Sequence, residues 1–175
     1  MRSKDPAATR LAWLNALSAR EAMQEFLKCC GSKRWARAMT HRRPYEGIGD
    51  LTLTSDKIWW SLVRSDWLEA FRNHPKIGEK KPTENVSEQS QQWSGQEQAG
   101  IASAAQQTRD ELARLNREYE AKFGFIFIVC AAGKSANEIL ANLRRRLQNE
   151  IETELPIAAA EQAKITEIRL KKLVN

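Results

Sequence analysis

The sequence predicts an all-α fold, and three observations support this prediction. Apolar residues recur at helical spacing along most of the chain, and Ser-x-x-Glu patterns typical of helix N-termini precede several of these stretches. The one strand-like segment has no second segment to pair with. The 175 residues, 42% of them hydrophobic, suffice for one buried core. We therefore predict a single-domain helical bundle over residues 10–175, preceded by a loose tail at residues 1–9.

Two helices are predicted first along the chain. Ser18 and Glu21 match a capping box ahead of Ala22, and Gly31 ends that helix. A second helix, from residue 57 onward, carries an aromatic stripe at helical spacing that predicts one buried face. The stripe consists of Trp60, Val63, Trp67 and Phe71.

His74 lies where this second helix is expected to break. Pro75 disfavours the α conformation of the residue before it, and Gly78 loosens the connection that follows. The polar residues 79–92 are predicted to form a loop or a short helix. His74 should therefore lie at the end of an element.

Three helices are predicted in the C-terminal half. A long amphipathic helix begins near Ser94, a second is capped by Ser135 and Glu138 and ends before Pro156, and the last covers residues 157–174. The residues that mark the buried faces of the first two are Ile101, Ala105, Thr108, Leu112, Leu115 and Tyr119, then Leu140, Leu143, Leu147 and Ile151.

The segment FGFIFIVC, residues 123–130, has the composition of a buried strand. A lone strand has no hydrogen-bonding partner. We therefore predict that tertiary contacts hold it as an apolar connection, either extended or helical.

The composition argues against several classes of protein. No apolar stretch reaches the roughly 18–20 residues of a membrane span, and no signal peptide is present. The three cysteines lack CxxC spacing, which favours reduced thiols, and neither His41 nor His74 has metal-ligand spacing. The last residues, Leu173–Asn175, lack a peroxisomal signal. We expect a cytoplasmic protein without a metal or a membrane partner.

The net charge of +6 raises the question of nucleic-acid binding. The basic residues are dispersed, and the only triple, Arg144–Arg146, is typical of a solvated helix face. We therefore expect no nucleic-acid partner, and an anionic small molecule fits the charge equally well.

The stretch WSGQEQAG, residues 93–100, permits two interpretations. Ser94 and Glu97 match a capping box, which would be purely structural. The same two side chains and Gln98 also project from one side of a helical turn, so they could line a polar pocket at a helix N-terminus that favours anions. A histidine at a helix end, such as His74, is likewise structural more often than catalytic.

The order of the motifs resembles one known family. HPKIG (74–78), SGQEQ (94–98), the segment 115–140, LRRRLQNE (143–150) and KITEIRLKKL (164–173) are together similar to 2-oxo-4-hydroxy-4-carboxy-5-ureidoimidazoline (OHCU) decarboxylases of urate degradation. The resemblance covers roughly residues 10–174. It implies an all-helical, homodimeric carboxy-lyase that converts OHCU to (S)-allantoin and carbon dioxide without a cofactor.

The resemblance also implies roles for single residues. His74 would be the acid or base and Glu97 its partner, and Arg146 or Arg169 would meet the substrate carboxylate. Substrate would further contact Pro75, Ser94, Gln98, Phe125, Ile126, Phe127, Ile128 and Val129. Ile126 stands where relatives often carry proline.

These roles require His74 and Glu97 to face each other across a cavity that accommodates a ureido-substituted ring. The alternative is a non-catalytic helical module that binds an anionic ligand or a protein partner. A preformed pocket at these two residues favours the enzyme.

Overall fold

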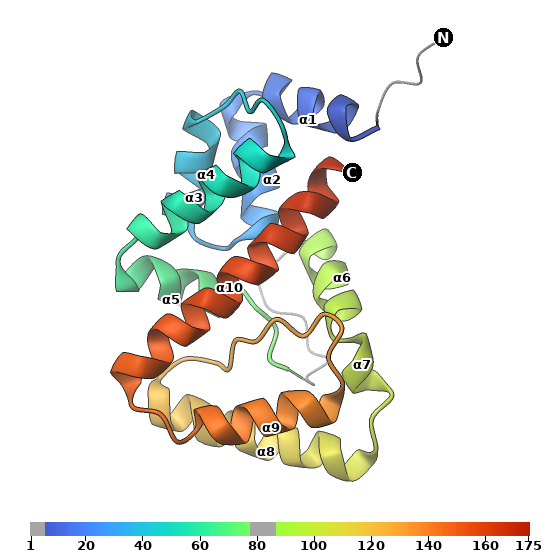
Figure 1. The fold of residues 1–175 in the computed structure, drawn as a ribbon, viewed down its shortest axis with the longest axis vertical. Helices are drawn as coiled ribbons and strands as arrows, with labels where there is room; N and C mark the ends of the chain where they lie inside the picture. The colour runs from blue at the N-terminus through green and yellow to red at the C-terminus, as the bar shows by residue number, and fades with distance from the viewer. Residues whose placement is uncertain (1–5, 78–86) are drawn as a thin grey trace. The chain divides into compact units, whose positions relative to one another are not determined.

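The computed structural model describes residues 6–77 and 87–175, which form helices and no strand. The helices, drawn in Figure 1, are α1 (Pro6–Ala16), α2 (Ala19–Cys29), α3 (Lys33–His41), α4 (Ile48–Ser61), α5 (Arg64–Arg72), α6 (Glu88–Glu97), α7 (Ala99–Ala102), α8 (Gln106–Phe123), α9 (Ala136–Arg146) and α10 (Ile151–Val174). The all-α prediction is confirmed. None of the described helices is long and apolar enough to cross a membrane. The predictions for residues 78–86, Gly78 included, lie outside the described residues.

The described residues divide into two compact units. The first contains residues 6–70 and 163–175, and the second contains residues 71–77 and 87–162, so α10 contributes to both. The extent of the single domain predicted for residues 10–175 stays a prediction. Helix α1 begins at Pro6, so residues 6–9 are helical and not part of a loose tail as predicted. Proline is favoured at a first helical position, because it has no amide N–H to leave unpaired there.

The first unit has a core of helices α2, α3 and α4. The rings of Trp35 and Tyr45 pack edge-on against Phe26, with ring centroids 5.9 and 6.2 Å away. The predicted capping box at the start of α2 is present, since Ser18 and Glu21 bond each other's backbone amides. This helix ends at Cys29, two residues before Gly31.

The prediction of a single helix that carries the aromatic stripe is wrong. Helix α4 ends at Ser61, Leu62 is extended with ψ 156°, and α5 begins at Arg64. The physical reason is a competing cap: the carboxylate of Asp66 accepts a hydrogen bond from the Val63 amide at 3.3 Å and starts a new helix. Two helices therefore replace the single predicted one, and the predicted stripe is not buried throughout: Trp60 is 44% exposed and Val63 is 54% exposed.

The predicted start of a long helix near Ser94 is also wrong. Ser87 caps α6 instead, accepting a hydrogen bond from the Ser90 amide at 3.2 Å, so Ser94 lies inside a helix. The chain then breaks twice, and α8 begins after Ala105, which is exposed. The buried face predicted further along, at Leu112, Leu115 and Tyr119, is confirmed.

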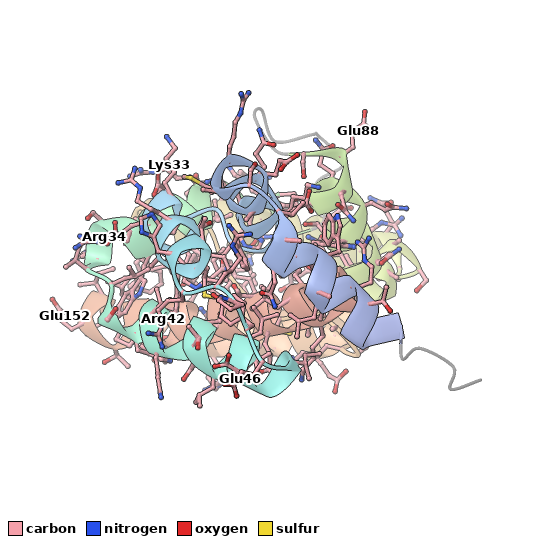
Figure 2. All side chains as sticks on the ribbon, turned by 90° about the horizontal axis from the view of Figure 1, so that it is seen from above. Lys33, Arg34, Arg42, Glu46, Glu88 and Glu152 are labelled. Atoms are coloured by element: carbon pink, nitrogen blue, oxygen red, sulfur yellow. The ribbon has the colours of Figure 1, made fainter. Side chains whose placement is uncertain are left out.

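Pro156 does not separate two helices as predicted, because α10 runs through it. Proline lacks an amide N–H, so residue 156 cannot donate to the carbonyl of Glu152. Glu152 is exposed in the first turn of α10, and its side chain lies at the surface (Figure 2). Water can therefore reach that region, which reduces the cost of the missing bond.

Helix α9 begins with the predicted capping box. The Glu138 amide donates to Ser135 Oγ at 3.3 Å, and the Ser135 amide donates to the Glu138 carboxylate at 2.7 Å. The hydrogen bonds from the backbone and then the side chain of Ser135 lower the pKa of Glu138. Because its pKa in the folded state is depressed, the stabilisation is present above the unfolded pKa and is lost as pH falls through the folded pKa.

Replacement of Ser135 tests this cap. Ser135→Ala should lower the free energy of unfolding at pH 7 by about 0.5–2 kcal/mol, measured by urea denaturation. The difference from the unchanged protein should shrink at acid pH. Ser103→Ala is the control, because the Ser103 hydroxyl is exposed and makes only a 3.5 Å contact with the Gly100 carbonyl. Equal effects of both changes would contradict the capping role.

The second unit is built on α8 and α9, which pack side by side (Figure 1). Gly124, with φ 76°, ends α8 in the left-handed conformation. Residues 126–130 then form a connection that is neither helix nor strand, so of the two predicted forms the helical one is wrong. Phe123, Phe125 and Phe127 surround the Tyr119 ring, with centroids 4.6, 5.8 and 5.2 Å from it.

The three consecutive arginines at the end of α9 do not form one solvated face as predicted. Arg144 and Arg145 are exposed, but Arg146 is only 1% exposed because it faces the core of the second unit. In the first unit, Figure 2 shows Lys33, Arg34 and Arg42 at the surface. They do not form an uninterrupted basic patch, since Arg34 lies 3.7 Å from the carboxylate of Asp66.

Candidate active site

His74 lies just beyond the end of α5, as predicted, and helix α8 fixes the backbone that follows it. The His74 amide donates to the Phe71 carbonyl at 3.1 Å. Two residues of α8 hold the next part of the chain: Asn116 Nδ2 donates to the Ile77 carbonyl at 3.0 Å, and Glu120 lies 2.6 Å from the Lys76 ammonium. The chain is therefore held in place both before and after His74.

Ser94, Glu97 and Gln98 lie in the last turn of α6 and directly after it. The Gln98 amide donates to the Ser94 carbonyl at 3.1 Å, which closes this turn. The capping-box interpretation of Ser94 and Glu97 is therefore wrong, and so is the expected helix N-terminus with its anion-binding amides. The reason is that Ser87 starts α6 two turns earlier.

A pocket in the second unit gathers residues from three segments of the chain. It is lined by His74, Pro75, Ile77, Ser94, Glu97, Gln98, Phe127, Ile128, Val129 and Ala131. His74 and Glu97 thus line one pocket, and six of the predicted substrate-binding residues line it with them. The roles of all these residues stay predictions.

The enclosed part of the pocket is smaller than expected from the sequence. Its volume is about 20 Å³, which holds one or two water molecules, whereas the whole concavity with its open space is about 330 Å³. The expectation of a cavity shaped for a substituted ring is therefore not met. A ligand of that size requires the open part of the concavity or movement of lining side chains.

Four of the predicted substrate-binding residues are not among those lining the pocket. Phe125 is buried against Phe71, with ring centroids 5.5 Å apart, and Ile126 is half-buried. Arg169 is buried in the first unit, where its positive charge acts on the thiols of Cys29 and Cys30. Burial raises the pKa of Cys30 to about 11 despite this charge.

Arg146 lies behind the pocket wall in a buried polar cluster. Its Nε donates to Glu154 at 2.7 Å, its Nη2 lies 2.5 Å from the same carboxylate, and its Nη1 donates to the Ile128 carbonyl at 2.7 Å. Tyr119 donates a short hydrogen bond to Glu154, and Asn149 donates another at 2.7 Å. Burial and the neighbouring carboxylate raise the pKa of Tyr119, so it remains a neutral donor.

Further side chains hold Cys130, which directly follows the wall residues 127–129. The Cys130 amide donates to Glu161 at 2.8 Å, and Lys134 Nζ donates to the Cys130 carbonyl at 2.5 Å. Burial raises the pKa of the Cys130 thiol, with smaller effects of the Glu161 and Glu97 carboxylates in the same direction.

Gly100 allows a close backbone approach beside this wall. A β-carbon at position 100 would lie 2.6 Å from the Lys134 carbonyl oxygen, so a larger residue would force the two segments apart. Gly100 thereby couples α7 to the chain that leads from the pocket into α9.

Several functional neighbours were missed by the sequence analysis. Ile77 and Ala131 line the pocket, and Asn116, Glu154 and Glu161 support it. Asn116 follows Leu115 on a buried face, and a polar residue there is a detectable signal. Glu161 carries no such signal, because its partner is a backbone amide 31 positions away.

The chemistry of the pocket combines one imidazole, one carboxylate, one amide and one hydroxyl with an apolar wall. Such a set can exchange protons with a small polar ligand and hydrogen-bond it in a defined orientation. Among the residues that the structure describes, no group of three His, Cys, Asp or Glu side chains is placed to hold a metal ion.

Fold and pocket define a class, that of a small all-helical protein with a pocket lined by a histidine and a carboxylate. Residues 15–171 match the model of the OHCU decarboxylase family. The chain belongs to this family.

Individual relatives agree with this assignment. The chain is 37% identical to the 2-oxo-4-hydroxy-4-carboxy-5-ureidoimidazoline decarboxylase of Xenopus laevis, over 76% of this chain and 75% of that one. A crystal structure of OHCU decarboxylase in the presence of (S)-allantoin matches with a TM-score of 0.74 and 37% identity, covering 86% of this chain and 96% of that one.

A longer relative is the uric acid degradation bifunctional protein of Arabidopsis thaliana. The chain is 40% identical to it over 86% of its own length, but spans only 47% of the relative. The chain therefore spans less than half of this bifunctional relative.

Proposed function

We propose that this chain decarboxylates OHCU to (S)-allantoin and carbon dioxide in urate degradation. The observation that carries the proposal is that His74 and Glu97 line one pocket in a member of the OHCU decarboxylase family. The Xenopus laevis relative bears the name of this activity, and a similar crystal structure was obtained in the presence of (S)-allantoin.

The proposed reaction uses the substrate as its own electron acceptor. The bond between the ring carbon and the carboxylate breaks, and its electron pair moves into the conjugated C=N of the ring as carbon dioxide leaves. The ring nitrogen that receives these electrons takes up a proton from solvent, which gives an ene-ol. His74 then accepts the proton of the ene-ol hydroxyl as the carbonyl forms, and delivers a proton to one face of the ring carbon that carries the ureido group. One imidazole can perform both transfers, because its ordinary pKa near 6.5 makes both protonation states accessible at neutral pH.

The rest of the pocket has complementary roles in this proposal. Glu97 sets the tautomer of His74 or holds the ureido group, and Ser94 and Gln98 offer further hydrogen bonds. The apolar wall at residues 127–129 keeps the substrate carboxylate poorly solvated. A carboxylate that loses water contacts is raised in energy relative to a transition state with dispersed charge, which favours loss of carbon dioxide.

Glu97→Gln tests the role of the carboxylate. We expect kcat/KM to fall about 10²-fold or more while the melting temperature stays unchanged, because the amide keeps the size of the side chain but can no longer serve as an anion. Glu88→Gln is the matched control: Glu88 lies in the first turn of the same helix and is exposed (Figure 2). Full activity of Glu97→Gln would refute a catalytic role for this carboxylate.

The proposed function itself is tested with OHCU generated in situ. Upstream enzymes convert urate to OHCU, this protein is added, and the optical activity of the allantoin is followed. Rapid formation of one enantiomer supports the proposal. Slow racemic allantoin, as without the protein, refutes it, and ligand binding without turnover would favour a non-catalytic binding module.

The proposal further includes a cytoplasmic homodimer that needs no cofactor. Four exposed apolar side chains support the dimer: Ile48, Leu53, Trp60 and Val63, on α4 and directly after it, are each at least 39% exposed. A partner that covers several of them at once would remove apolar surface from water. Light scattering should give twice the mass of one chain, and activity should survive exhaustive dialysis against a chelator.

A further inference from the structure

The pocket wall, residues 127–129, lies in a segment that is neither helix nor strand and whose backbone is bonded by charged side chains. Within the described part of the chain, residues 126–130 pair with no strand. Three polar groups of this backbone are bonded by side chains instead: the Ile128 carbonyl by Arg146, the Cys130 amide by Glu161 and the Cys130 carbonyl by Lys134. Hydrogen bonds with one charged partner are stronger than neutral ones.

These side chains come from elements outside the wall. Arg146 ends α9, Glu161 lies in α10, and Lys134 precedes α9. All three lie in the second unit, as does the wall itself. The position of the wall is therefore fixed by elements that do not line the pocket.

Each of the three nitrogens of the Arg146 guanidinium is bonded within the protein. It is 1% exposed, its Nε and Nη2 engage Glu154, and its Nη1 engages the Ile128 carbonyl. The guanidinium also lies over the Phe127 ring, 4.6 Å from the centroid. Its charge is neutralised by Glu154, which is fully buried.

We infer that Arg146 and Glu161 are positioning residues, which fix the wall residues 127–129 in the pocket without touching the substrate. The inference deepens the proposed function and rests on it for its kinetic consequence. Arg146 holds the carbonyl between Phe127 and Val129, two residues that line the pocket. A small shift of such a wall misaligns the reacting groups and lowers the rate of the chemical step.

Variants at Arg146 distinguish positioning from substrate binding. Arg146→Lys keeps the charge but cannot bond Glu154 and Ile128 with the same fork, so we expect kcat per folded molecule to fall about tenfold or more, with a smaller change in KM. Arg146→Gln should lower kcat per folded molecule by as much. Arg144→Gln is the control, because Arg144 is on the same helix and pairs with Glu111 at the surface. If Lys restores activity and Gln mainly raises KM, Arg146 meets the substrate and the inference is overturned.

Glu161 provides a test that does not depend on a deeply buried ion. Glu161→Gln keeps an oxygen for the Cys130 amide, and Glu161→Ala does not. We expect exchange of the Cys130 amide hydrogen to be about tenfold faster or more in the alanine variant, and faster by a smaller factor in the glutamine variant, whose neutral oxygen still accepts the bond. Activity should follow the same order. A glutamine variant as impaired as the alanine variant would indicate a role of the charge and overturn the inference.

Hydrogen exchange separates this inference from the proposed function. If the unchanged protein does not convert OHCU, the proposed function fails, yet exchange of the Cys130 amide still reports whether Glu161 holds the wall. If the protein is active and neither exchange nor activity changes in Glu161→Ala and Arg146→Lys, the positioning role fails alone.

Discussion

His74→Asn lowers kcat/KM by about 10²–10⁴-fold and leaves the fold intact, which is the largest effect on activity that we expect. Asparagine keeps a polar side chain of moderate size but cannot exchange a proton near neutral pH. His74 is half-buried, and the main-chain contacts of its segment run through Asn116 and the Phe71 carbonyl. The substitution therefore removes proton transfer without removing these contacts.

The measurement is steady-state formation of (S)-allantoin together with circular dichroism and thermal melting. The chain has two histidines, so His41→Asn is a matched control. His41 is exposed at the end of α3 and belongs to the other compact unit. An active His74→Asn variant would remove the acid–base role of this imidazole. A decrease of similar size in both variants would show that the loss is not specific to the pocket.

Glu154→Leu should lower the free energy of unfolding by about 3–5 kcal/mol, because it leaves the buried guanidinium of Arg146 without a counterion. Glu154 and Arg146 are 0% and 1% exposed, so water cannot replace the lost partner. Tyr119 and Asn149 lose an acceptor at the same time. For a chain of this length the melting temperature should fall by roughly 6–20 °C.

A double replacement checks that the cause is the unpaired charge. Arg146→Met combined with Glu154→Leu should recover part of the loss, because an apolar pair of similar volume carries no desolvation penalty. Glu111→Gln is the surface control: it weakens the exposed pair with Arg144, which is worth about 0–1 kcal/mol. A single replacement at Glu154 no more destabilising than this control would contradict the proposed importance of the pair.

Local patterns predicted the helices whose termini are encoded within a few residues. The capping boxes at Ser18 and Ser135 correctly placed the starts of α2 and α9. Periodicity alone was misleading around Val63, since apolar spacing continued smoothly across a break that the Asp66 carboxylate creates. At Ser94 the sequence matches a capping box, but no helix begins there, because Ser87 provides an earlier cap for the same helix.

The candidate site was predictable as a set of residues but not as a shape. Motif order identified His74, Glu97 and most of the wall, and these residues line one pocket. Helical spacing could not tell whether the Arg146 side chain lies at the edge of the apolar face or in the core. Its burial depends on the ion pair with Glu154, eight residues later in another helix. The small enclosed volume depends on side-chain packing, which the sequence does not specify directly.

The way the backbone of the wall is held affects which pocket side chains can vary. Its main chain is secured by Arg146, Glu161 and Lys134 through backbone atoms alone, so these bonds do not depend on which side chains stand at positions 127–129. Natural variation or laboratory evolution can exchange the side chains at positions 128 and 129, and with them ligand preference, while these backbone bonds remain. Phe127 is more constrained, because its ring packs against Arg146 and Tyr119. Selectivity and architecture are thus encoded at separate positions of the chain.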